Sequence, residues 1–128
     1  YVTIDTTSNS DDFGDITEGR RGTMSVSNLT RGIFAGGAVS GGVERTAIDY
    51  VTIASKGNGT NFGDLTGTAR FVGAGCSNTT RGCFAGGYDG DNNFNVIDYI
   101  TIDSKGNATD FGDLTVATRF ASGVSDLT

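Results

Sequence analysis

The sequence predicts an all-β fold built from short antiparallel strands. Glycine supplies 21 of the 128 residues and proline is absent, while apolar residues reach only 36% and are interrupted every few positions by small or polar residues. This composition is typical of short strands joined by many turns. The strongest observation is an internal repeat, because one pattern of residues returns three times at a fixed spacing.

The repeat has a period of 49 residues. A Tyr-Val/Ile-Thr-Ile tetrapeptide returns at this spacing, and so do a Phe-Gly-Asp-Ile/Leu tetrapeptide and an arginine that follows it. The copies are residues 1–4, 50–53 and 99–102, residues 13–16, 62–65 and 111–114, and Arg21, Arg70 and Arg119. A further heptapeptide, residues 31–37 and 81–87, is offset by 50 residues, so we expect one-residue length changes in connecting loops.

Each unit is expected to form four strands in chain order. The first runs through residues 24–26, 75–76 or 123–124, and the second through residues 33–34 or 83–84 into a glycine pair. The third covers residues 48–53 or 97–102, and the fourth is centred on residues 62–65. Residues 55–60 and 104–109 contain the glycine and asparagine that tight turns favour, which predicts a hairpin between the third and fourth strands.

The unit resembles the Kelch repeat of β-propellers. A Kelch unit has an apolar strand ending in a glycine pair, a loop, a strand bearing a tyrosine, a turn, and an aromatic residue that is usually tryptophan. The matching residues are Gly36, Gly37, Tyr50 and Phe62 in one copy and Gly86, Gly87, Tyr99 and Phe111 in the next. Phenylalanine replaces the usual tryptophan, and its distance from the tyrosine is longer than usual. The resemblance implies propeller blades, with a stacked-sheet β-solenoid as the alternative geometry.

The chain is interpreted as one repeat domain, residues 1–128, with a partial unit at 1–30 and further units at 31–80 and 81–128. It holds about 2.6 units, whereas a propeller ring needs roughly four to eight blades. The chain therefore cannot close a ring alone. We expect it to be a segment of a longer protein or to associate with copies of itself, which would cover an exposed sheet edge.

Charge and residue content exclude several function classes. The formal net charge is −6 and the nine basic residues are scattered, which disfavours nucleic acid and anionic membrane surfaces as partners. No apolar run is long enough to insert into a membrane. Histidine is absent, so a Ser-His-Asp or Cys-His catalytic site cannot form. The sequence predicts a protein that is not an enzyme and uses no cofactor.

The recurring carboxylates are expected to be structural. They are Asp15, Asp64 and Asp113, and Asp49 with Asp98. A pair of carboxylates could serve as acid and base. However, a residue placed identically in each unit is more often structural, and the spacing favours an ion pair of Asp64 with Arg70 or a turn cap.

Three sets of residues are candidate sites for modification or binding. Cys76 and Cys83 replace Val26 and Ile33 of the preceding unit, so they are either a cross-strand disulfide or two reduced apolar thiols. Asp89, Asp91 and Asn93 alternate as in a calcium loop, but the downstream bidentate glutamate is missing and an ordinary loop is the alternative. Four Asn-x-Ser/Thr sequences are candidate glycosylation sites or simply good turn sequences, at Asn28, Asn58, Asn78 and Asn107.

Three segments of the repeats also resemble repeat sequences in virion proteins of marine bacteriophages. They are residues 48–53, 104–115 and 78–87. This resemblance implies a virion or extracellular setting. The expected function is that of a structural and recognition module in a tail fibre or similar appendage, binding a host receptor or glycan. A self-assembling extracellular fibril subunit, with glycosylation as an option, is the alternative.

Overall fold

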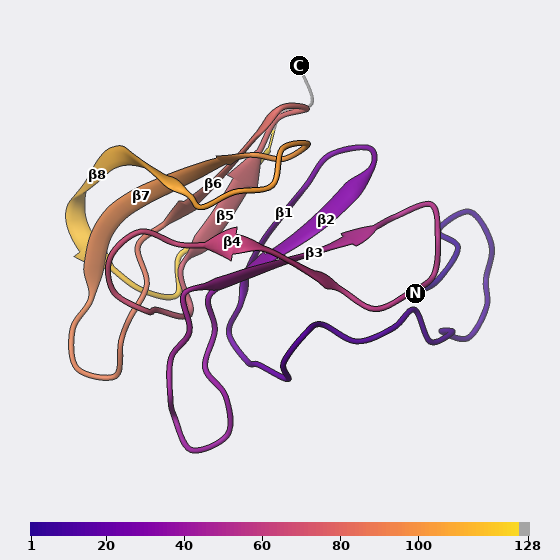
Figure 1. Cartoon of the computed structure of the whole chain (residues 1–128), viewed down its shortest axis with the longest axis horizontal. Coiled ribbons are helices and arrows are strands. Elements are labelled where there is room, and N and C mark those ends of the chain that lie inside the picture. Colours follow the sequence, from indigo (N-terminus) through magenta and orange to yellow (C-terminus); the bar gives the residue numbers. More distant parts are fainter. Residues whose placement is uncertain (126–128) are drawn as a thin grey trace.

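The computed structural model describes residues 1–125, which form eight strands in two sheets (Figure 1). The first sheet contains β1 (Met24–Ser27), β2 (Arg31–Ala35), β3 (Ala47–Thr52) and β4 (Thr60–Asp64). The second contains β5 (Ala74–Ser77), β6 (Arg81–Ala85), β7 (Phe94–Thr101) and β8 (Thr109–Thr118). Residues 1–125 contain no helix, and hence none with the length and hydropathy of a membrane span.

Both sheets are antiparallel, with the strands side by side in chain order. Their registers repeat: β1 pairs Met24 with Ala35, and β5 pairs Ala74 with Ala85. The predicted hairpin turns join β3 to β4 and β7 to β8. The prediction of all-β, four-stranded antiparallel units is therefore confirmed.

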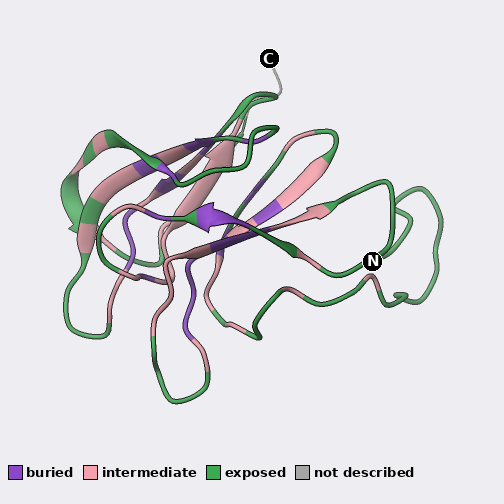
Figure 2. Cartoon of the chain, in the orientation of Figure 1, coloured by how far each residue is buried: buried purple, intermediate pink, exposed green. Residues whose placement is uncertain are grey.

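The hydrophobic core lies where the two sheets meet, with β1 against β5 and β6. Side chains alternate between the faces of a strand, so one face of each sheet turns toward the other sheet. The first sheet contributes Val26, Ile33 and Phe62, and the second contributes Phe84, Ile100 and Ile102. Each of these side chains contributes about 1.5–3 kcal/mol by leaving water. In Figure 2 the N-terminal segment and β8 are mostly exposed, while the buried residues lie on the strands and connecting segments between them.

The predicted strand at residues 123–124 is absent, and two other segments with the repeat pattern are not strands. Residues 1–4 and 13–16 carry the patterns of a third and a fourth strand, but both are irregular. Residues 123–124 are also irregular, although Ser125 Oγ still accepts a hydrogen bond from the Ser77 N–H at 2.9 Å. A strand needs a neighbouring strand to share its backbone hydrogen bonds. The described chain has no second strand of the repeat beside residues 1–4 or 123–124. Residues 13–16 have no regular third strand beside them, although Tyr1 and Asp11 exchange backbone hydrogen bonds.

Candidate functional site

A buried ion pair joins the two sheets. Arg70 follows β4, and its Nη2 donates to Asp98 Oδ2 on β7 at 2.8 Å, with both side chains at most 2% exposed. Thr66 donates to the same carboxylate from its backbone N–H at 3.0 Å and from its hydroxyl. The Arg70 Nε donates to the Gly86 carbonyl at 3.0 Å. Asp98 is thus a buried charge whose cost is offset by an opposite charge and several hydrogen bonds.

The same arrangement recurs where the N-terminal segment crosses the first sheet. Arg20 Nη2 donates to Asp49 Oδ2 at 2.6 Å, and Thr17 donates to this oxygen from its backbone N–H at 3.2 Å and its hydroxyl at 2.7 Å. Both charged side chains are fully buried. Two carboxylates that recur in the sequence are therefore taken up in contacts between segments.

These ion pairs correct two predictions. The sequence repeat matches Arg21 with Arg70, but Arg20 is the structural equivalent, because residues 13–20 are one residue shorter than residues 62–70. The expected pairing of Asp64 with Arg70 is also wrong. Asp64 accepts a hydrogen bond from the Thr46 hydroxyl at 2.8 Å, while Arg70 pairs with a carboxylate on the neighbouring sheet.

A second recurrent contact joins two of the three Phe-Gly-Asp sequences to a following hairpin turn. The Gly106 N–H donates to the Phe62 carbonyl at 3.0 Å, and Asn107 Oδ1 accepts from the Asp64 N–H at 3.1 Å. Gly63 lies so close to this turn that a Cβ there would overlap the Gly106 carbonyl. The invariant glycine of the repeat thus permits two backbones to touch.

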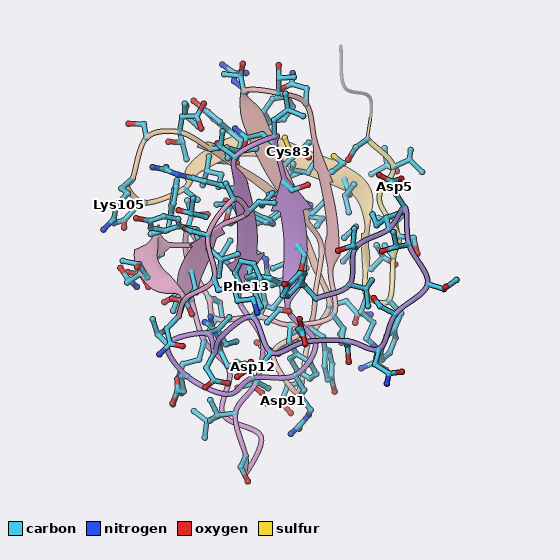
Figure 3. The ribbon with its side chains drawn as sticks, turned by 90° about the vertical axis from the view of Figure 1, so that its right-hand side faces the viewer. Asp5, Asp12, Phe13, Cys83, Asp91 and Lys105 are labelled. Atoms are coloured by element: carbon cyan, nitrogen blue, oxygen red, sulfur yellow. The ribbon has the colours of Figure 1, made fainter. Side chains whose placement is uncertain are left out.

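The N-terminal segment makes the same contact with the turn of the first sheet. Gly57 N–H donates to the Phe13 carbonyl at 2.9 Å, and Asn58 Oδ1 accepts from the Asp15 N–H at 3.0 Å. Figure 3 looks onto this side, where Phe13 lies in front of the strands of the first sheet. Residues 13–20 therefore act as a cover for that sheet.

All four asparagines of the glycosylation sequences accept structural hydrogen bonds. Asn58 accepts from the Asp15 N–H and Asn107 accepts from the Asp64 N–H, as described above. Asn28 Oδ1 accepts from the Arg31 N–H at 2.9 Å, and Asn78 Oδ1 accepts from the Arg81 N–H at 2.7 Å, within the turns β1–β2 and β5–β6. These bonds supply a turn-forming reason for each sequence, and glycosylation stays a prediction.

Cys76 and Cys83 lie directly opposite each other on β5 and β6, both as free thiols. Burial raises the pKa of Cys83, and the neighbouring Cys76 adds to the shift. The register places the pair where a cross-strand disulfide would form in an oxidising setting, so that prediction stands as one for experiment.

The candidate calcium loop is organised by its own backbone. Asp89 Oδ1 accepts from the N–H groups of Asp91 at 2.9 Å and Asn92 at 2.7 Å, which lower the pKa of Asp89. Within residues 1–125 no three carboxylate, imidazole or thiolate side chains cluster at metal-binding distances. Asp89 thus has a turn-forming role, while Asp91 and Asn93 are exposed on the loop.

The loops between second and third strands form a surface that the repeat does not share. Residues 38–46 and 88–93, here called the loop surface, differ in length and chemistry although the strands around them match. Both loops extend toward the lower side of Figure 1. They are neighbours, because a Cβ at Gly90 would lie 3.3 Å from a carboxylate oxygen of Glu44.

The base of the loop surface is held by charged and aromatic contacts. Arg45 Nε and Nη2 donate to the two carboxylate oxygens of Glu18 at 2.7 and 2.9 Å, and these bonds lower the pKa of Glu18. Arg119 lies over the Tyr88 ring, 4.1 Å from its centroid. These contacts hold the base of the loop surface in place. The exposed residues of the loop surface carry amide, carboxylate and hydroxyl groups.

Sequence reasoning missed the partners of Asp49 and Asp98 and the loop surface. Proximity in the sequence suggested Asp64 as the partner of Arg70, but the true partner lies 28 residues away on another sheet. A comparison of the two units position by position would have shown that these two loops differ although β2 and β6 nearly match, which is a usable signal for a variable surface.

Comparison of the sequence with protein-family models gives no match, and comparison with curated proteins gives none either.

Proposed function

We propose that the chain is part of a Kelch-like β-propeller that serves as a non-catalytic structural and recognition module. The observation that carries this proposal is that repeated residues and variable loops have different roles. The repeated Asp, Arg, Asn and Gly residues are used in contacts between sheets. The two loops of the loop surface differ between the units, and binding residues are often found on loops held by a rigid scaffold.

Several features support propeller blades. Each sheet has four antiparallel strands in chain order, as a blade does. Gly36 begins the glycine pair after β2 with φ of +64°, and a Cβ there would overlap the Arg70 carbonyl of the segment after β4. Tyr50 packs edge-on against Phe62 with ring centroids 6.0 Å apart, and Tyr99 against Phe111 at 5.9 Å. The residues that carry the Kelch resemblance thus have matching structural roles in both sheets.

The setting we propose is a phage tail fibre or another virion or cell-surface appendage. This setting rests on the resemblance of the repeat sequences to repeats in phage virion proteins. The ligand class that suits the loop surface is a host receptor or glycan, because Asp91, Asn92 and Asn93 are exposed and can hydrogen-bond to hydroxyl and amide groups.

Binding to a glycan array and to intact bacterial cells tests the recognition function. We expect Asp91→Ala to weaken binding about tenfold or more, as loss of a hydrogen bond to a charged group does. Asp5→Ala is the matched control, because Asp5 is exposed and lies well apart from Asp91 (Figure 3). Equal binding by both variants, or no binding by the parent chain, would remove the recognition part of the proposal.

A fibril subunit is the second candidate, and the exposed outer strand β8 favours it. An uncovered sheet edge or face is a ready site for self-association. Negative-stain microscopy separates the two candidates, because long unbranched filaments indicate the fibril subunit and discrete rings or short capped particles indicate the module.

A further inference from the structure

One face of the second sheet has the residues of an interface but no cover. This outer face consists of Cys76, Cys83, Tyr99, Phe111 and Leu114. Their repeat equivalents on the first sheet are core residues or pack on the core, and Phe62 is 3% exposed because the second sheet covers it. Its equivalent Phe111 is 57% exposed.

The surface that would cover it is present at the opposite side of the same chain. The second sheet covers the first with Phe84, Ile100 and Ile102, and the equivalents on the first sheet form a receiving face. This receiving face consists of Phe34, Val51 and Ile53 with the adjoining turn at residues 55–60. In Figure 1 the turn between β3 and β4 lies near the N-terminus, whereas β8 lies at the other side of the molecule.

The N-terminal segment covers the receiving face only in part. Its residues Tyr1, Phe13 and Ile16 leave a cavity of about 290 Å³ against Phe34 and Val51. Ile4 is 95% exposed, so the segment does not bury all of its own apolar residues. At the equivalent place between the two sheets there are core side chains from β1 and β2, Val26 and Ile33.

We propose that copies of this chain associate head to tail, with residues 111–119 of one copy replacing residues 13–20 of the next. The partner is a second copy because the outer and receiving faces are the two halves of the interface already formed within the chain. The incoming segment has the same sequence as residues 62–70 at six of nine positions, including the Phe-Gly-Asp-Leu-Thr start and the final arginine.

The known contacts then have equivalents between copies. Asn58 of the second copy accepts from the Asp113 N–H as Asn107 accepts from Asp64. Lys56 of the second copy lies over Tyr99 as Lys105 lies over Tyr50, where the ammonium is 5.8 Å from the ring centroid. Gly112 is open, with nothing within 4 Å of a Cβ built there, so the turn of the second copy has room to approach.

Arg119 preserves the buried charge pair during this exchange. It lies eight residues after Phe111, as Arg70 lies eight after Phe62, and no carboxylate within residues 1–125 pairs with it. To replace Arg20 as the partner of Asp49 in the second copy, Arg119 leaves the Tyr88 ring. The end of β8 also shifts by one residue, because Thr118 now accepts the bond from the Gly87 N–H that Arg70 accepts from the Gly37 N–H. The carboxylate therefore stays neutralised when residues 13–20 leave, which avoids the large cost of a buried unpaired charge.

A head-to-tail interface of this kind forms a ring if the rotation closes and a filament if it does not. Each copy contributes two sheets. Since propellers have roughly four to eight blades, a ring would contain about two to four copies.

Light scattering coupled to size exclusion tests the inference on the 128-residue chain. We expect the parent chain to show a mass that rises with concentration to two or more copies. Phe111→Asp should shift it to a single copy, because a carboxylate on the outer face would have to be buried in the interface. Val43→Asp is the matched control, since Val43 is also exposed, at 53%, but lies on the loop surface.

Mixing adds a second readout. The Phe111→Asp chain keeps its receiving face, so it should cap parent assemblies and reduce their mean mass in proportion to its share. Circular dichroism checks that the variant folds. A single-copy mass for the parent at every concentration, or assemblies that survive Phe111→Asp, would overturn the inference. The inference goes beyond the proposed recognition function, and because mass rather than ligand binding is measured, either proposal can fail alone.

Discussion

Phe62 and Phe111 occupy the same position of the same sequence pattern, yet one lies in the core and the other on the surface. Both pack edge-on against the tyrosine of their own sheet at nearly the same distance. The difference is the neighbouring sheet, which covers Phe62 and has no counterpart over Phe111 within residues 1–125. In a stacked repeat, the energetic role of a residue is set by its neighbouring unit as much as by its own.

Removing the ion pair between the sheets should give the largest change in the free energy of unfolding. Asp98→Ala leaves Arg70 buried without its carboxylate, and we expect a loss of about 3–5 kcal/mol of unfolding free energy. Urea unfolding measures it. The control Asp113→Ala removes an exposed carboxylate and should change stability by less than about 0.5 kcal/mol. Similar midpoints for the two variants would mean that the ion pair does not hold the sheets together.

Truncating the two phenylalanines tests the comparison directly. Phe62→Ala should cost about 3 kcal/mol through lost burial and a residual cavity, whereas Phe111→Ala should cost well under half of that in the single chain. Thermal or urea unfolding at low protein concentration gives both values. Equal losses would show that a cover lies over Phe111 as well.

Alanine substitutions at the glycines of two Phe-Gly-Asp sequences should differ in stability by a smaller amount. An added methyl at Gly63 would overlap the Gly106 carbonyl, while Gly112 has open space around it. Both have positive φ, at 159° and 137°, so the backbone strain of an alanine is present in each variant. We expect Gly63→Ala to destabilise by about 1–3 kcal/mol more than Gly112→Ala, because only the former forces backbones apart. A difference near zero in unfolding midpoints would contradict the close approach.

The asparagine of the hairpin turn should have the smallest effect. Asn107→Ala removes the acceptor for the Asp64 N–H, for a loss of about 1 kcal/mol. Thr109→Ala is the control, because it abolishes the glycosylation sequence but keeps the asparagine. If the turn contact is what matters, protein made without glycosylation should lose stability only with the first variant.

The accuracy of sequence reasoning differed between strands and contacts. The strands of both complete sheets were predictable, because apolar residues and turn residues return at a fixed spacing. The partner of Arg70 was not, since spacing in sequence carries no information on which carboxylate lies across a sheet interface. The strand expected at residues 123–124 proved irregular, and so did the repeat pattern at residues 1–4, because a strand pattern forms a strand only beside another strand.

The sequence by itself determined the repeat, the strand order and the turns, because these follow from local backbone preferences and from the alternation of apolar side chains. Only the tertiary structure decided which carboxylates became buried and paired, which phenylalanine entered the core, and which loops came together as one surface. Those outcomes depend on the distances between segments far apart in the chain, and burial and ion pairing respond to distance in space.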